Sequence, residues 1–328
     1  MDKTTLTAII NALRAGETPM MTVEDFPCFS EQATEGNEHI SPEDLMCLAK
    51  SLTEADIPTF ERALCAMDEG DLAWLGFKIP FDPSVAVTNV DNEVTKKYGN
   101  VGSADGEPLV FFCNDAKEVV ASREYSPRDF FQMKDVTRGP SMHNEQFDGL
   151  TWTSVALFDS VRVWLLGASD ASSEVAALAT HVGFDVCVVD YDPAYVSESR
   201  FPDARRIVLS HFDEIDTLAA DPADYVCVLT RGHMFDPEGC VWALKNHVYY
   251  VGMMGCAGKN ERVYELVRNA GVSDEDWERV KRPIGLKFGA KTPAELAIAI
   301  VAELVDVRYQ QRYSQEARAK HEASLGRS

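Results

Sequence analysis

Residues 161–190 constrain the fold of this chain more than any other stretch. An apolar run over 161–166 ends at Gly167, and a second run over 186–189 ends at Asp190. Between the two runs, apolar residues recur at helical spacing. Strand, glycine turn, helix, strand and terminal aspartate follow the order of a βαβ unit that begins a nucleotide-binding parallel sheet. The sequence therefore predicts an α/β fold around this unit.

The glycine turn departs from the Gly-x-Gly-x-x-Gly pattern that binds dinucleotides. The chain reads Gly167-Ala168-Ser169-Asp170, so Ser169 puts a side chain where backbone would approach a pyrophosphate. Asp170 adds negative charge where a helix N-terminus attracts phosphate. One interpretation is that Ser169 or Asp170 caps the helix; the other is that Asp190 still meets a ribose hydroxyl. We favour the cap and expect NAD(P) binding to be weak or absent.

Composition excludes some classes of partner. The net charge of −22 over 328 residues argues against binding to nucleic acid or to an anionic membrane, which both require a basic face. No apolar run approaches the roughly 20 residues of a membrane span, and residues 1–16 resemble an amphipathic helix rather than a signal peptide. The eight cysteines include no Cys-x-x-Cys pair, which fits a cytoplasmic protein without a disulfide framework.

We expect two domains and a tail. Residues 1–155 read as a smaller α+β domain: helices up to about residue 75, turn-rich segments with a strand at 108–113, a polar loop over 123–150 and a strand near 151–158. Residues 156–310 read as a Rossmann-like domain, and residues 311–328 as a polar tail. The first domain shows no chemical constellation, because Cys28, His39 and Cys47 are too irregularly spaced for a metal site.

A polar cluster follows one strand of the second domain. Buried strands are predicted at 206–209 and 224–229, with a helical stretch around 212–219 between them. The later strand ends in Thr230-Arg231-Gly232-His233, with Asp236 three residues on. Ligands of open α/β sheets bind outside the carboxyl ends of strands. His233 and Asp236 could hold a phosphate, a pterin edge or a proton; alternatively they satisfy backbone groups and cap the next helix.

A second cluster follows a predicted strand at 247–251. Gly252, Gly255, Gly258 and Lys259 precede a helix and form a candidate anion cradle, although a lysine in this position is often solvated surface. Cys256 is a candidate reactive thiol near a helix N-terminus, or simply a small residue. Further on, Thr292-Pro293-Ala294-Glu295 predicts a capping box and a buried, largely apolar helix over 296–308.

Several motifs together resemble the C-terminal domain of the XdhC/CoxI family, accessory proteins of xanthine dehydrogenase and related molybdenum hydroxylases. They are Arg200-Phe201-Pro202, Thr230-Arg231-Gly232-His233 with Asp236, Tyr250-Val251-Gly252-Met253-Met254-Gly255, Pro283-Ile284-Gly285-Leu286, Gly289-Ala290 with Thr292-Pro293 and Glu295, and Ala302-Glu303. The family commonly has Gly-Ala-Gly-His where this chain has Gly167-Ala168-Ser169-Asp170, so the resemblance is to a divergent member.

The resemblance implies a cytoplasmic, usually homo-oligomeric protein that binds molybdenum cofactor and delivers it to an apo molybdenum hydroxylase. It can also engage a cysteine desulfurase, and the family is not known for catalysing hydride transfer. No catalytic residue and no metal ligand is predicted. The alternatives are an NAD(P)-dependent oxidoreductase and a ligand-free scaffold that docks on the hydroxylase. The predicted cofactor-binding residues are Gly167, Ser169, Asp190, Thr230, Arg231, Gly232, His233, Asp236, Gly252, Gly255, Cys256 and Lys259.

Overall fold

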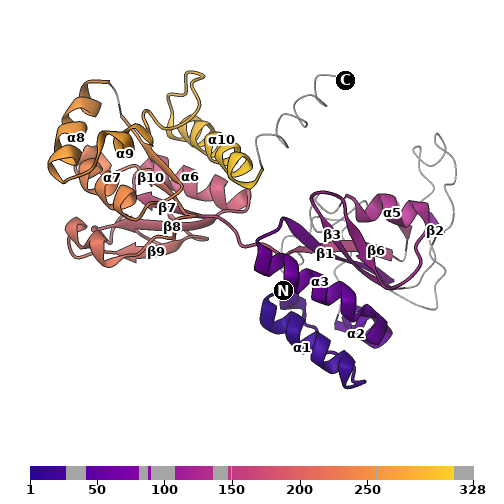
Figure 1. Cartoon of the computed structure of the whole chain (residues 1–328). Coiled ribbons are helices and arrows are strands. Elements are labelled where there is room, and N and C mark those ends of the chain that lie inside the picture. The colour runs from indigo at the N-terminus through magenta and orange to yellow at the C-terminus, as the bar shows by residue number, and fades with distance from the viewer. Residues whose placement is uncertain are drawn as a thin grey trace. The chain divides into compact units, whose positions relative to one another are not determined.

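The computed structural model describes residues 1–26, 42–80, 88–89, 108–135, 147–148, 150–255 and 257–313. The chain divides into two compact units, Met1–Asp159 and Ser160–Ser328; Figure 1 shows the elements of both. The expected boundary after residue 155 falls at the end of strand β6 (Leu150–Ala156). In the described part of the chain, no helix combines the length and the apolar character needed to cross a bilayer.

The C-terminal unit is built on a six-stranded parallel sheet in the order β12-β11-β10-β7-β8-β9. Because β7 to β9 extend the sheet in one direction and β10 to β12 in the other, the order reverses between β7 and β10, where Rossmann-type sheets bind ligands. The predicted α/β class and parallel sheet are confirmed. The strands are β7 (Arg162–Leu166), β8 (Asp185–Asp190), β9 (Arg205–Val208), β10 (Tyr225–Val228), β11 (Tyr250–Met253) and β12 (Val280–Lys281).

Helices cover both faces of this sheet (Figure 1). On one face, α6 (Asp170–His181) and α10 (Pro293–Arg312) pack on each other and on residues such as Val163 and Val188. On the other face, α7 (Asp236–Lys245), α8 (Ala257–Asn269) and α9 (Asp274–Glu278) enclose a core around Trp164 and Trp242. The alternation of residues along β7 between the two cores is the two-residue period of a strand buried on both faces.

Four predicted elements of this unit need correction. Strand β9 is largely exposed rather than buried, because it lies at the sheet edge. The segment from Phe212 to Thr217 is a 3₁₀ helix, and β11 begins at Tyr250, not at residue 247. The sequence of α10 predicts a helix buried on all sides, but Ile298 and Val305 are exposed. The helix also continues to Arg312, into the predicted tail.

The N-terminal unit has a four-stranded antiparallel sheet in the order β4-β3-β1-β6. One face carries α1 to α3 over a core that includes Leu6, Phe60 and Phe77, and α5 lies against residues such as Trp152 on the other. The elements are α1 (Lys3–Arg14), η1 (Val23–Asp25), α2 (Pro42–Ser51), η3 (Glu54–Asp56), α3 (Ile57–Glu69), β1 (Ala73–Pro80), β2 (Thr88–Asn89), β3 (Leu109–Asn114), β4 (Val119–Ala121), α5 (Pro127–Met133) and β5 (Phe147–Asp148), with β2 paired to β5.

This unit confirms the predicted smaller α+β domain and corrects two of its segments. The amphipathic helix at the N-terminus and the strands near 108–113 and 151–158 are present. The long strand β1 and the helix α5 lie where turns and loop were expected, and α5 begins with a capping box between Ser126 and Asp129. Cys28 and His39 lie outside the described residues.

The capping box at Thr292 is confirmed: its side chain accepts a hydrogen bond from the Glu295 amide at 3.2 Å. Thr292→Ala should cost about 1 kcal/mol of helix stability, because it removes an N-cap oxygen, whereas Thr292→Ser should be neutral. Hydrogen exchange of amides in the first turn of α10 measures the effect, and equal protection in Thr292→Ala and wild type would contradict it.

Candidate functional site

The glycine turn after β7 packs tightly against the end of β10. Gly167 has a φ of +105°, and a Cβ built on it would lie 2.5 Å from the Cα of Thr230 and 2.7 Å from the carbonyl oxygen of Leu229. Both the left-handed backbone and this close approach require glycine. Gly167 is therefore explained by contact between two strand ends, without a bound ligand.

The residues after Gly167 satisfy one another. Ser169 caps α6 by accepting a hydrogen bond from the Ser172 amide at 3.1 Å, and the Ser172 hydroxyl donates to the carbonyl oxygen of Gly167 at 2.6 Å. Asp170 forms an ion pair with Arg200 at 3.0 Å. The capping interpretation of Ser169 is thus confirmed, and the turn is internally hydrogen-bonded where a pyrophosphate would lie.

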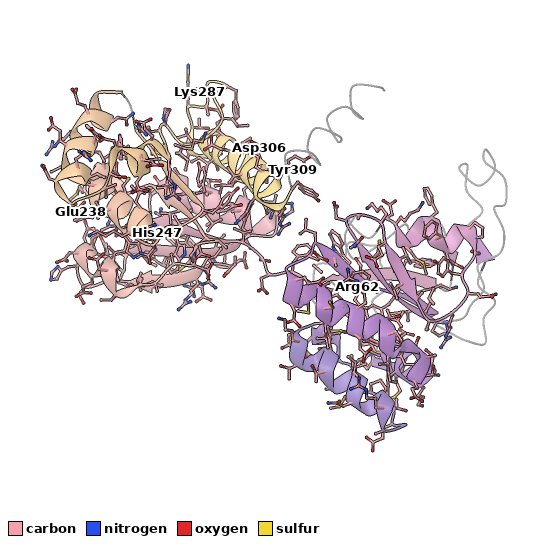
Figure 2. All side chains as sticks on the ribbon, in the orientation of Figure 1. Arg62, Glu238, His247, Lys287, Asp306 and Tyr309 are labelled. Atoms are coloured by element: carbon pink, nitrogen blue, oxygen red, sulfur yellow. The ribbon has the colours of Figure 1, made fainter. Side chains whose placement is uncertain are left out.

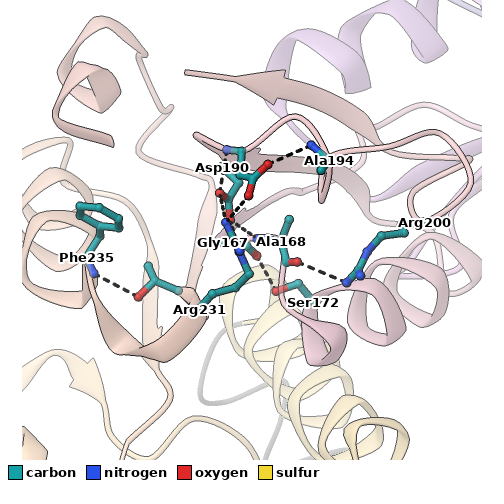
Figure 3. A network of polar contacts seen from close by, with 10 residues as sticks. Gly167, Ala168, Ser172, Asp190, Ala194, Arg200, Arg231 and Phe235 are labelled. Carbon is teal, nitrogen blue, oxygen red and sulfur yellow. Dashed lines mark hydrogen bonds and ion pairs between the residues drawn. The ribbon is translucent and has the colours of Figure 1, made fainter. Parts of the chain in front are cut away.

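The carboxylate of Asp190 lies beside this turn and accepts hydrogen bonds from several groups of the chain (Figure 3). It is 2% exposed, accepts the amides of Ala168 at 2.8 Å and Asp192 at 3.1 Å, and pairs with the Arg231 guanidinium at 3.2 Å. Burial opposes ionisation of Asp190, but the hydrogen bonds from Arg231 and the two amides outweigh it and lower the pKa of the carboxyl. The Asp190 carboxylate, which could have met a ribose hydroxyl, is therefore bound by Arg231 and by two backbone amides of the same chain.

Arg231 is held from a second side. Its guanidinium lies 3.7 Å from the centre of the Tyr195 ring, and it also contacts Asp192 at 3.4 Å. Tyr195 was not predicted, and the sequence carries no signal for it, because an aromatic residue in a loop between strands forms no motif. The stacked, paired arginine covers Asp190 on the side where β8 ends.

His233 and Asp236 form the second part of the site. The Nδ1 atom of His233 lies 2.8 Å from an oxygen of Asp236, and the Thr230 hydroxyl donates to the other oxygen of the same carboxylate. Asp236 is 1% exposed, whereas the His233 side chain is partly exposed. Gly232 and His233 both have left-handed backbones, with φ values of +64° and +60°. The non-glycine outlier marks a place where surrounding contacts over-determine the backbone.

His233 lines a cavity of about 280 Å³, which lies on the side of β10 that faces β11 rather than β7. Apolar side chains dominate its wall, and it lies between the segments that follow β10 and β11, the loop after β12 and the start of α10. The Ile284 amide donates a hydrogen bond to the carbonyl oxygen of Met253 at 2.9 Å, which holds the loop after β12 against β11. The structure brings His233 and Gly255 together here, while Gly167 lies against Thr230 instead. The lining residues are His233, Met254, Gly255, Pro283, Ile284, Leu296 and Ile300.

The predicted anion-binding loop is wrong, because three of its four residues, Gly252, Gly258 and Lys259, lie in a strand or a helix. Gly252 belongs to β11, where a Cβ would lie 2.5 Å from the Tyr250 hydroxyl, so it is a packing glycine. Gly258 and Lys259 lie inside the first turn of α8, which begins at Ala257. The hypothesis about the thiol of Cys256 falls outside the described residues, and the side chain of Lys259 does as well.

The thiols of Cys187 in β8, Cys227 in β10 and Cys240 on α7 are buried. Burial raises the pKa of Cys187 to about 12 and raises the pKa values of Cys227 and Cys240 further, so these thiols stay protonated and pack as small apolar groups. Among the described side chains, no group of His, Cys, Asp and Glu is arranged to hold a metal ion.

A parallel sheet with helices on both faces and a site at its carboxyl edge defines the C-terminal unit as a Rossmann-type domain. Residues 163–304 match the family model of the XdhC Rossmann domain. This part of the chain belongs to that domain family, as the sequence motifs indicated.

The comparisons also find individual proteins. A Bacillus subtilis protein described as a probable xanthine dehydrogenase subunit is 27% identical over 54% of this chain and 52% of its own length. The uncharacterized Escherichia coli protein YqeB is 26% identical over 45% of this chain and 27% of its own length. The chain thus spans about half of the first relative and about a quarter of the second.

Two solved structures also resemble the chain. A Bacillus halodurans protein described as a xanthine dehydrogenase is 21% identical, covers 82% of this chain and 69% of its own, and has a TM-score of 0.44. The myo-inositol 2-dehydrogenase of Lactobacillus plantarum is 12% identical over 34% of each chain, with a TM-score of 0.27.

The closed turn yields a binding prediction. NADH should not bind at low micromolar concentration, because Arg231 occupies Asp190 and Ser169 obstructs the pyrophosphate position. Titration of the chain with NADH, followed by nicotinamide fluorescence and by calorimetry, tests this. A dissociation constant in the low micromolar range would contradict the prediction and support the oxidoreductase alternative.

The lowered pKa of Asp190 yields a stability prediction. A carboxyl whose folded pKa is depressed contributes stability above its unfolded pKa of about 3.9, and that contribution is lost as the pH falls through the folded pKa. Asp190→Asn should therefore lower the free energy of unfolding of the C-terminal unit by about 1–3 kcal/mol at pH 7, with the difference from wild type shrinking below about pH 4.

Urea unfolding at a series of pH values, followed by tryptophan fluorescence, to which Trp164, Trp242 and Trp277 contribute for the C-terminal unit, measures this difference. Asp192→Asn is the matched control, because this partly exposed carboxylate shares the same arginine and should cost less. A loss in Asp190→Asn that stays constant from pH 7 to pH 3 would refute the assignment.

Proposed function

We propose that this chain is an accessory protein of a xanthine-dehydrogenase-type molybdenum hydroxylase, which binds molybdenum cofactor in the cavity beside His233 and delivers it to the apo-enzyme. The match to the XdhC Rossmann domain supports the class, and the description of the Bacillus subtilis relative points to the same enzyme. Homo-oligomer formation and the cysteine desulfurase partner stay predictions.

The observation that carries this proposal is the placement of His233. Asp236 engages Nδ1 of the ring, which leaves Nε2 as the nitrogen available to a ligand. A buried carboxylate behind an imidazole sets the orientation of the ring. The imidazole edge is therefore presented at a fixed angle to an otherwise apolar cavity.

The residues of the cavity fit the pterin part of the cofactor. A pterin is a flat ring system with hydrogen-bonding edges, and binding sites for such ligands combine apolar walls with a few placed polar groups. Ile284, Leu296 and Ile300 provide the wall, while His233 and the backbone at Gly255 provide polar contacts. The cofactor supplies the redox centre that the hydroxylase uses; the residues of this chain bind it, orient it and shield it from water.

The same geometry disfavours the oxidoreductase alternative. A nicotinamide dinucleotide would extend over the switch point between β7 and β10, where Gly167 contacts Thr230 and Arg231 pairs with Asp190. The open volume lies instead between β10 and α10, lined on one side by Leu296 and Ile300.

Replacing His233 should separate cofactor binding from folding. His233→Asn removes the imidazole but retains a residue that tolerates the left-handed backbone, so the melting temperature should change little. Cofactor affinity should fall by about 1–3 kcal/mol, the scale of one hydrogen bond to a charged group. Pterin fluorescence and molybdenum content of protein purified from a molybdate-fed host measure the retained cofactor.

His247→Asn is the matched control, because His247 is exposed and has a similar φ of +54°. Figure 2 shows it on the C-terminal unit. Equal cofactor retention in His233→Asn and His247→Asn would remove His233 from the site. A large loss of melting temperature in His233→Asn alone would assign His233 a structural role.

A further inference from the structure

The loop that leads into α10, residues 285–291, differs in charge from the rest of the chain. Residues 279–294 contain five Lys or Arg and no Asp or Glu, in a chain with 31 basic and 53 acidic residues. Within the described residues, the ammonium groups of Lys287 and Lys291 have no carboxylate at ion-pair distance. Figure 2 shows Lys287 at the outer end of this loop, pointing away from the domain.

The same loop exposes apolar side chains. Phe288 is 54% exposed and Leu286 45%. Two further exposed apolar residues are Ile298, next to Ala299, which accepts the Leu286 amide, and Met234, directly after His233. An exposed apolar patch rimmed by polar or charged groups marks a protein-interaction site, and the rim of such an interface is polar.

The loop is held in place at both ends. Glu303 accepts hydrogen bonds from the Tyr250 hydroxyl and from the Gly285 amide, and the Leu286 amide donates to Ala299 at 3.1 Å. At the other end, the Lys291 amide donates to Glu295 at 2.8 Å. A loop with fixed ends loses less conformational entropy on binding than a free one.

The loop is also continuous with the wall of the cavity. Pro283 and Ile284, just before it, and Leu296, shortly after it, line the cavity beside His233. A protein seated on the loop would therefore lie at the cavity opening, where it could take up a ligand directly. A second copy of this chain in that place would obstruct the opening, and two copies of net charge −22 repel each other.

We propose that the 285–291 loop, with Phe288 as its apolar anchor and Lys287 and Lys291 as its cations, docks onto an acidic surface with an apolar pocket on the hydroxylase that receives the cofactor. This inference rests on the proposed accessory function. Phe288 enters the pocket and the two lysines pair with carboxylates around it, so the cavity faces the partner.

The test measures binding of the full chain, free of cofactor, to the cofactor-free xanthine dehydrogenase of the same organism. Phe288→Ser should weaken binding about tenfold or more, as expected for a central aromatic anchor. Lys287→Glu with Lys291→Glu should weaken it to a similar extent, with a difference from wild type that shrinks at high salt. Pterin retention should stay unchanged in both variants, because neither changes a residue of the cavity wall.

Matched controls carry the same changes elsewhere. Phe131→Ser alters a similarly exposed phenylalanine on α5, and Lys50→Glu with Lys245→Glu repeats the charge change at two exposed lysines. Both controls should bind within about twofold of wild type. Loop variants that bind as tightly as these controls would overturn the proposal. So would light scattering that shows Phe288→Ser dissociating a homodimer while affinity for the enzyme is unchanged.

Failure of the cofactor site gives a different result. If His233→Asn retains full cofactor while the loop variants still lose binding to the enzyme, the docking surface is supported and the cofactor site is refuted. Loss of retention in His233→Asn together with unchanged binding by the loop variants overturns the docking surface alone.

Discussion

The pairing of Arg231 with the buried carboxylate of Asp190 joins the carboxyl ends of three parallel strands. Asp190 ends β8, its oxygen accepts the Ala168 amide just after β7, and Arg231 follows β10. At the point where the strand order reverses, removing the carboxylate would leave the amides of Ala168 and Asp192 without their acceptor, and would leave the Arg231 guanidinium only its weaker contact with Asp192. In most sheets of this type that point is reserved for a ligand; here it is filled by side chains of the chain itself.

With the switch point closed, the open part of the carboxyl edge lies beyond β10. There, His233 projects into an apolar cavity, and its orientation depends on Asp236, which is in turn fixed by the Thr230 hydroxyl. Thr230 and Asp236 bind each other, and Asp236 binds Nδ1 of His233. Nε2 of His233 is therefore the atom of the imidazole that remains for a ligand in the cavity. The arrangement fixes the orientation of the imidazole that faces the cavity.

The cavity wall and the exposed loop before α10 are parts of one continuous segment, because Pro283 and Ile284 line the cavity directly before the loop begins. Glu303 on α10 holds the segment that begins at Gly285, and Ile284 is hydrogen-bonded to β11. A partner that binds the loop would thus act on the same segment that lines the cavity. In the proposed accessory function, this connection would link the bound cofactor to the protein that receives it.

Local features were readable from the sequence because they depend on residues a few positions apart. The βαβ unit of residues 162–190, the cap at Ser169, the box at Thr292 and the proximity of His233 to Asp236 all follow from periodicity and capping chemistry. The motif resemblance placed the domain in its family for the same reason, since it rests on short segments in a fixed order.

Only the tertiary structure decided which distant residues meet. Arg231 and Asp190 are 41 positions apart, and the cavity wall combines Ile284, Leu296 and Ile300 with His233. In the N-terminal unit, Lys78 is buried 3.7 Å from Asp129 inside a strand, although a lysine predicts an exposed position. Sheet order brings such groups together, and sequence periodicity carries no information about sheet order. The sequence by itself therefore determined the elements and the family of the C-terminal domain, while packing determined that Arg231 pairs with Asp190 at the switch point and that a cavity lies beside His233.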